Sequence, residues 1–292
     1  MATKKQIILY MKRIVFTFIC ISFLTSFFAQ KVADKKIQAG LVTGFGLNFT
    51  NPTTKYISRN GIGNDLIIGM NFNYNYTPTI GISSGLEFDF ETIKFTTDST
   101  LYYLYNDSEI LSKSQYVNSD NIFKNAESKV YQIKARNEKP IYLSIPTMFL
   151  FRTEFIGYLR YFGKFGLRNS FLLGSTIYDE GFSVVNNSLE NKISSVAMTN
   201  DQMKSSNRNL ALYKGSIGLC GGTEWNFSGT TSLVFELGYY YGLLNISRGN
   251  ALTGDSEKNM SIITNLDNNK PTKFNNFSAK QNQLLFKVSI LF

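Results

Sequence analysis

Apolar and polar residues alternate with a period of two along eight separate segments of this chain, and this pattern constrains the fold more than any other feature. In the first segment, from Ile37 to Phe49, every second residue is apolar or Thr, and mostly Gly and polar residues stand between them. Successive side chains of a β-strand point to opposite faces, whereas a helix has a period of 3.6. The pattern therefore predicts strands, each with one apolar and one polar face.

The other seven segments are expected at 68–76, 80–91, 141–151, 161–173, 213–227, 233–243 and 284–292. Their connections alternate in length. Those at 77–79, 152–157 and 228–231 are short, whereas those at 50–63, 96–129, 178–208 and 246–276 are long and polar. An even number of strands joined in this way predicts an all-β fold, an eight-stranded antiparallel up-and-down β-barrel with every short turn and both termini at one end.

The direction of the apolar face needs further evidence, because secreted soluble barrels such as lipocalins show the same alternation with the opposite sense. The chain has 25 Phe and 17 Tyr, which would overfill an eight-stranded interior but are unrestricted in lipid. Aromatic residues also gather near the short turns, as in the girdle of a membrane barrel. They are Tyr74, Tyr76, Trp225, Phe227 and Phe292. We therefore expect a transmembrane barrel with short periplasmic turns and long extracellular loops; a soluble sheet is the alternative.

The polar faces carry acids and bases in nearly equal number. Five acids and four bases form the predicted ionic network of the barrel interior: Glu87, Asp89, Glu91, Glu224, Glu236, Lys164, Arg168, Lys214 and Lys287. Buried charges are tolerated when they pair and form hydrogen bonds, and an eight-stranded barrel has no room for a wide channel. The sequence thus predicts a plugged lumen, in which the acids serve structural pairing rather than catalysis.

The beginning of the chain predicts export. Basic residues between Lys4 and Arg13 precede an apolar run over 14–28, the order found in secretory signal peptides. We expect a signal peptide over 1–29 and an outer-membrane barrel domain over 30–292, with Met11 as an alternative start to Met1. A retained membrane anchor is the competing interpretation, although the run is short for a spanning helix.

Three segments resemble the PorT-like, OmpA-like β-barrel family of Bacteroidetes outer membranes: Tyr142–Pro146, Tyr161–Gly166 and Phe286–Phe292. The resemblance covers about residues 37 to 292, and the family more often has Glu where Ser144 stands. It implies an outer-membrane barrel and, through PorT-like members, a role in the type IX secretion pathway. The final residue, Phe292, looks like the signal that the barrel-insertion machinery reads, which would make that machinery a partner. A lipid-facing strand end is the alternative reading of Phe292.

The composition argues against several kinds of chemistry. The chain has no histidine, so a Ser-His-Asp catalytic site is excluded. Only Cys220 remains after the predicted signal peptide, and no run has the spacing of a calcium loop, so no metal site is predicted. We expect no catalytic, cofactor-binding or metal-binding residues. The scattered bases of an exported chain also do not indicate a nucleic-acid partner.

Function is then expected in the barrel itself or in its loops. The predicted loop at 96–129 contains Tyr102, Tyr103 and Tyr105, and the chain begins its return at Val130–Ile133, so a hairpin could extend beyond the membrane. Exposed tyrosines there would suit recognition of protein or glycan; packing against neighbouring loops is the alternative. We favour a nonenzymatic barrel in outer-membrane lipid that serves envelope integrity or surface interaction. An accessory in protein secretion and a small-solute pore are the alternatives, so envelope or secretion proteins are the expected partners.

Overall fold

The computed structural model describes residues 35–53, 56–106, 109–110, 129–184, 192–198, 210–247, 262–263, 274–275 and 278–292. The predicted signal peptide at 1–29 lies outside these residues. Within the described ranges, no helix is long and apolar enough to cross a membrane. The regular structure assigned there consists of β-strands.

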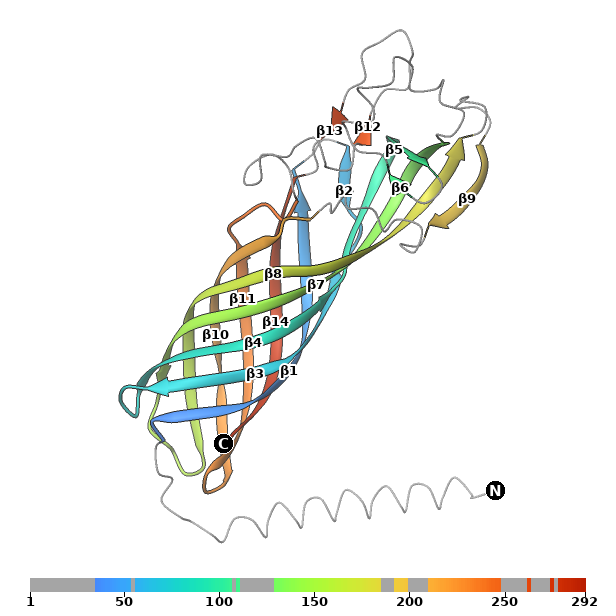
Figure 1. Ribbon diagram of the computed structural model, residues 1–292. Coiled ribbons are helices and arrows are strands. Elements are labelled where there is room, and N and C mark those ends of the chain that lie inside the picture. The colour runs from blue at the N-terminus through green and yellow to red at the C-terminus, as the bar shows by residue number, and fades with distance from the viewer. Residues whose placement is uncertain are drawn as a thin grey trace, which may run out of the picture.

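Eight strands close into a barrel (Figure 1). They are β1 (Ile37–Pro52), β3 (Gly63–Asn75), β4 (Ile80–Glu91), β7 (Lys129–Arg152), β8 (Leu159–Val184), β10 (Tyr213–Ser228), β11 (Thr231–Gly242) and β14 (Ala279–Leu291). Each strand pairs antiparallel with the next, and β14 pairs with β1 to close the ring. The prediction of an eight-stranded antiparallel up-and-down barrel is therefore confirmed.

Short turns join the strands at one end of the barrel, where the C-terminus also lies (Figure 1). Gly157 and Gly229 occupy two of these turns with φ of 67° and 45°, a backbone conformation that glycine adopts without steric cost. The N–H of Phe292 donates a hydrogen bond of 2.8 Å to the carbonyl of Ala39. The last residue is thus held against the first strand of the barrel, and its side chain is exposed.

The outer surface of the barrel is apolar and the interior is polar. Phe45, Leu219 and Leu237 point outward and are 50%, 67% and 55% exposed. On β7 the exposed apolar side chains run from Ile141 to Phe151, and ten residues of a strand tilted by about 40° rise about 25 Å. This is the height of the apolar band of a membrane barrel, so the expected outward direction of the apolar face is correct.

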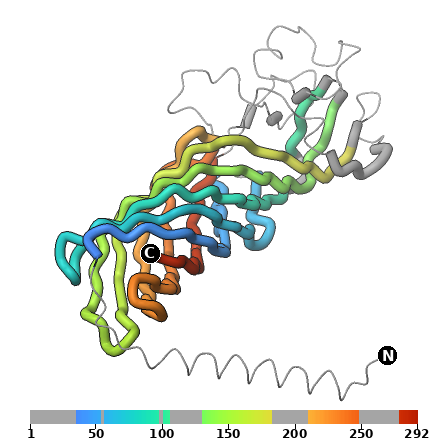
Figure 2. Tube along the Cα trace, turned by 60° about the horizontal axis from the view of Figure 1, so that its bottom comes forward, coloured from blue at the N-terminus to red at the C-terminus, as the bar shows by residue number. Residues whose placement is uncertain are grey.

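Three strands continue past the barrel at the end opposite the short turns (Figures 1 and 2). β5 (Ile93–Asn106) follows β4 directly and pairs with the first part of β7, which pairs in turn with the last part of β8. We call β5 with residues 129–139 of β7 and 175–184 of β8 the strand extension. Short strands line its edges: β2 (Ile57–Arg59), β6 (Glu109–Ile110) and β12 (Ile262–Ile263) pair with β5, β13 (Phe274–Asn275) pairs with β12, and β9 (Lys192–Met198) pairs with β8.

The strand extension confirms the hairpin expected at Leu101–Tyr105 and Val130–Ile133, and it corrects the boundaries of the predicted loops at 96–129 and 178–208. Both begin as paired strand, and the first also ends in strand at its last residue. In the first of these loops, Leu101–Leu104 and the paired Val130–Ile133 are buried at every position. A strand covered on both faces is a continuous apolar run and shows no alternation.

Candidate functional site

The nine charged residues predicted for the interior all lie inside the barrel and are buried. Arg168 on β8 is at the centre of this network. Its guanidinium donates hydrogen bonds of 2.7 and 2.8 Å to the two carboxylate oxygens of Asp89, and another to Glu87. On the other side, Lys287 Nζ donates to both oxygens of Glu87 at 2.8 and 3.0 Å. Two acids of β4 are thereby neutralised by bases from β8 and β14.

A serine pair completes the surroundings of Asp89. The Ser144 hydroxyl on β7 donates to Asp89, and its oxygen lies 2.6 Å from the Ser170 hydroxyl on β8. Ser144 adds no charge beside Asp89. A glutamate there would place a second carboxylate beside Asp89, and the small hydroxyl avoids this repulsion in a site that holds only one guanidinium.

Two further ionic groups flank the centre. Toward the strand extension, Lys214 pairs with Glu91, and the amides of Gln281 and Gln283 donate to Glu91 at 3.0 and 2.9 Å. Gln283 also donates to Asp65 at 2.9 Å, so the group joins β3, β4, β10 and β14.

Toward the short turns, Lys164 pairs with Glu236 at 2.6 Å. Below that pair, Arg160 binds both oxygens of Glu224 at 2.7 and 2.9 Å. Charge-assisted hydrogen bonds of this kind are roughly twice as strong as hydrogen bonds between neutral groups.

Three interior charges are absent from the sequence prediction: Asp65, Arg152 and Arg160, all buried. Their signal was nevertheless present in the chain. Arg160 stands four residues before Lys164, and Asp65 stands four residues before the interior Gly69. Residues at an even spacing along a strand point to the same face, so both belong to the polar face. With them, the described part of the barrel interior holds six acids and six bases, and its formal charge is balanced.

Apolar layers separate the ionic groups, which the prediction of a lumen filled by small and ionic groups did not include. One layer consists of Ile67, Met148, Cys220, Tyr240 and Leu285. The other, nearer the short turns, consists of Leu150, Phe162, Val234 and Leu291. The ring of Tyr240 lies 5.4 Å from the Arg168 guanidinium and 5.7 Å from Lys287 Nζ, where its electron-rich face attracts both cations.

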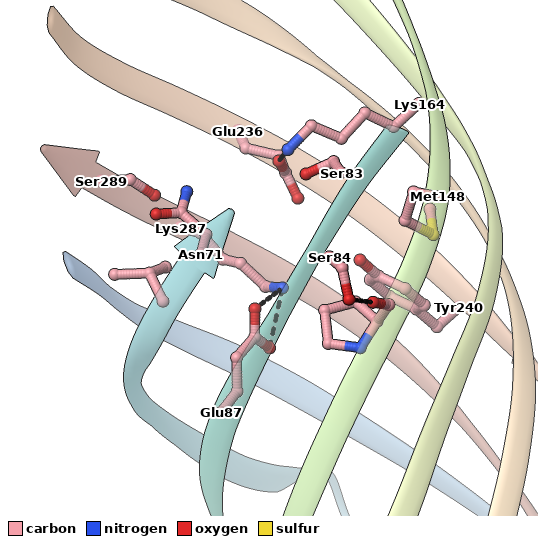
Figure 3. A pocket seen from close by; sticks show the side chains of 12 residues that line it. Asn71, Ser83, Ser84, Glu87, Met148, Lys164, Glu236, Tyr240, Lys287 and Ser289 are labelled. Carbon is pink, nitrogen blue, oxygen red and sulfur yellow. Dashed lines mark hydrogen bonds and ion pairs between the residues drawn. The ribbon is translucent and has the colours of Figure 1, made fainter. Parts of the chain in front are cut away.

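A small polar cavity remains between these layers, and Figure 3 shows Glu87, Lys164, Glu236 and Lys287 around it. Its volume is about 20 Å³, which suits about one or two water molecules. The lumen therefore contains water-sized space at this level, lined by the described side chains.

The strand extension holds the tyrosines that the sequence analysis proposed for recognition. Tyr102 and Tyr103 are 8% and 0% exposed, and Tyr105 is partly buried. Tyr103 stacks on Tyr131 with ring centroids 5.2 Å apart, and Tyr105 meets both rings edge to face. The expectation of exposed tyrosines is wrong for Tyr102 and Tyr103. The Tyr103 ring belongs to an apolar cluster, as the packing alternative required, and the buried Tyr102 hydroxyl accepts a hydrogen bond from the Gln132 amide.

A buried ion pair crosses the same region. Arg136 on β7 binds both carboxylate oxygens of Asp179 on β8 at 2.6 and 2.7 Å, and both side chains are fully buried. Burial opposes the charge on Arg136, but attraction to Asp179 outweighs it and raises the pKa of the guanidinium. For the Tyr103 phenol, burial disfavours the charged form and therefore raises its pKa well above the usual value. The strand extension thus encloses buried residues of its own, and their cluster continues into the adjoining end of the barrel through Tyr142, Leu172 and Ala279.

Replacing Tyr103 by Ala should open the strand extension without unfolding the barrel. Removing a buried aromatic ring costs about 3–5 kcal/mol, and this ring stacks on Tyr131 within the strand extension. We expect rapid cleavage of the variant by protease added to intact cells, with the barrel fragment still migrating as a folded species on unheated gels. Lys134→Ala, at an exposed position of the same extension, is the control. Equal protease resistance of the Tyr103→Ala variant and wild type would contradict this assignment.

Residues 28–248 match the family described as outer membrane protein β-barrel domain. Among solved structures, the chain is similar to Ail of Yersinia pestis, with 8% identity, a TM-score of 0.32 and coverage of 88% of this chain and 100% of that one. It is also similar to the N-terminal barrel of OprF from Pseudomonas aeruginosa, with 9% identity, a TM-score of 0.26 and coverage of 87% and 97%.

A third similar structure is the outer-membrane protease OmpT of Escherichia coli, with 10% identity, a TM-score of 0.28 and coverage of 91% and 99%. The comparison with curated protein sequences gave no significant match. Among the described residues, His, Cys, Asp and Glu form no group of three that could hold a metal ion.

Proposed function

Because this chain belongs to the family of outer-membrane protein β-barrel domains, we propose that it is a nonenzymatic barrel with a plugged lumen that acts in envelope integrity or surface interaction. The barrel resides in the outer membrane. Membrane barrels of this kind have short periplasmic turns and longer extracellular connections. The short turns of this chain then face the periplasm, and the strand extension lies on the outside of the cell. Its action is then expected at the cell surface and not through the lumen.

The filling of the lumen carries this proposal. Arg168 is fully buried between Glu87, Asp89 and the ring of Tyr240. A solute would have to break these bonds and leave buried charges without a partner and without water. This costs several kcal/mol for each ion. Transport through such an interior is disfavoured, whereas a rigid wall suits an anchor for surface structure.

The strand extension supports the surface role. It is held by paired strands and by the buried Arg136–Asp179 ion pair, so it is a rigid platform rather than a set of independent loops. Rigid elements position binding residues more accurately than loops do. Residues such as Lys134, which is exposed on the extension, are the ones we expect to meet a partner.

Site-specific crosslinking tests the surface role. A photo-crosslinking amino acid is placed at Lys134 on the strand extension and, in a second variant, at Thr77 in a short periplasmic turn; both positions are exposed. We expect capture of a surface protein or glycan from Lys134 in intact cells and no specific product from Thr77. The plugged lumen predicts no conductance when the protein is inserted in planar bilayers. Stepwise single-channel currents would support a small-solute pore instead.

A second candidate function rests on the resemblance to the PorT-like proteins of Bacteroidetes. The motif segments at 142–146 and 161–166 lie on the neighbouring strands β7 and β8, so one part of the barrel wall carries both. In this case the chain would be an accessory of type IX secretion, and its periplasmic turns would contact secretion subunits. Capture of such subunits from Thr77 would favour this function over a role at the surface.

A further inference from the structure

The outer surface changes from apolar to basic where β4 and β7 leave the membrane band. Lys139 stands two residues beyond Ile141, the last exposed apolar residue of β7 on this side, and Lys94 stands four residues beyond Phe90 of β4. Lys139 is exposed and Lys94 is half-buried, whereas their neighbours Ile93 and Glu138 are buried. The alternation therefore points both lysines outward, onto the face that lipid covers below them.

The register brings the two lysines together. Lys94 lies opposite Asn137, and Asn137 lies opposite Tyr178. Lys139, two residues from Asn137, lies opposite Thr176. Diagonal neighbours of this kind are roughly 7–8 Å apart on an antiparallel sheet. We call these five outward residues the basic patch; it contains no acid, and Glu180 lies one row farther from the membrane.

Tyr178 helps to hold Lys139 in place. The Lys139 ammonium lies 4.9 Å from the centroid of the Tyr178 ring, within the range of a cation–π contact. Asn137 and Thr176 add an amide and a hydroxyl to the same surface. The basic patch therefore offers two ammonium groups together with neutral hydrogen-bond donors.

The basic patch begins at the depth of the lipid headgroups. A strand tilted by about 40° rises about 2.5 Å per residue. By this rise, Lys139 lies about 5 Å beyond Ile141 of β7, and Lys94 lies about 10 Å beyond Phe90 of β4. A headgroup layer is about 5–8 Å thick on each side of the hydrocarbon, and lysine side chains can bend toward it.

We propose that the basic patch binds the phosphate group of a lipid in the outer leaflet. Ammonium groups form charge-assisted hydrogen bonds with phosphate oxygens, and Lys94 and Lys139 both lie on the face that this lipid would cover. The lipid chains would lie against the apolar band directly below, which is continuous with the patch along β4 and β7. This continuity favours a membrane lipid over a soluble phosphate compound, which would use only the lysines.

Lipid binding by the purified protein tests the proposal. Native mass spectrometry in detergent compares the affinity for bisphosphorylated lipid A of wild type, a Lys94→Gln/Lys139→Gln variant and a Lys35→Gln/Lys36→Gln control. The control removes the same charge at the periplasmic start of β1. Each lysine near a charged lipid surface contributes about a fivefold change in affinity, so we expect about 25-fold weaker binding for the patch variant and wild-type binding for the control.

Three results would overturn the proposal: an unchanged affinity of the patch variant, an equal loss in both variants, or displacement of the lipid by millimolar inorganic phosphate. The last result would identify a site for free phosphate. All three proteins are first shown to migrate as folded barrels on unheated gels, so a failure to fold cannot be mistaken for a loss of binding. The test does not depend on the proposed surface role, because crosslinking from Lys134 is a separate measurement.

Discussion

An Arg168→Met variant is expected to lose about 3–5 kcal/mol of folding free energy, because it leaves buried carboxylates without their base. Asp89 is fully buried and has Arg168 as its ion-pair partner, with Ser144 as a further donor. Glu87 retains Lys287, so most of the cost arises at Asp89. Methionine fills much of the volume of the arginine stem, which separates the loss of charge from the loss of packing.

Unfolding by urea in lipid vesicles measures this cost. Adding Asp89→Asn to the Arg168→Met variant removes the unpaired charge and should restore a large part of the stability, since an amide is far cheaper to bury than a carboxylate. Arg59→Met, at an exposed position outside the barrel interior, serves as the matched control and should stay within about 0.5 kcal/mol of wild type. A similar loss in the single and double variants would show that packing, not charge, dominates at this position.

Leu237→Arg should destabilise the barrel by about 2–4 kcal/mol, the cost of an arginine at the middle of the lipid face. Leu237 is 55% exposed on the outer surface and lies near the middle of β11. In a soluble protein, a charge at so exposed a position would change the stability by about 0.5 kcal/mol or less. The sign and size of this one effect therefore report whether lipid covers the surface.

The same urea titration in vesicles measures the effect of Leu237→Arg. Leu237→Met, which keeps an apolar side chain of similar volume, is the control and should behave like wild type. Arginine in place of Lys94, outside the apolar band, should also be tolerated. If Leu237→Arg were neutral, the outer face of β11 could not be in contact with lipid.

The sequence predicted the interior of the barrel better than it predicted the strand extension. Each of the nine interior charges was assigned to the correct face, because the pleat of a strand sends alternate side chains to opposite sides and this depends only on neighbouring residues. The part of the extension around Leu101–Leu104 lacks this alternation. Leu101–Leu104 are buried at four successive positions. The pattern therefore predicted a loop at Tyr102 and Tyr103, although both side chains are buried.

The sequence could not predict which acid pairs with which base in the ionic network. Glu87 and Lys287 are separated by 200 residues, and Glu91 and Lys214 by 123. Their contact depends on closure of the ring, on the stagger of each strand against the next and on the width of the lumen. The depth at which Lys94 and Lys139 meet follows from the same registers.

The sequence by itself determined the eight strands, their order and the side of each that faces lipid, because these follow from local alternation and from the lengths of the connections. The tertiary structure alone decided which acid meets which base, where apolar layers close the lumen and how far three strands run beyond the membrane. These properties arise from hydrogen bonds and packing between segments distant in the chain, which no local pattern encodes.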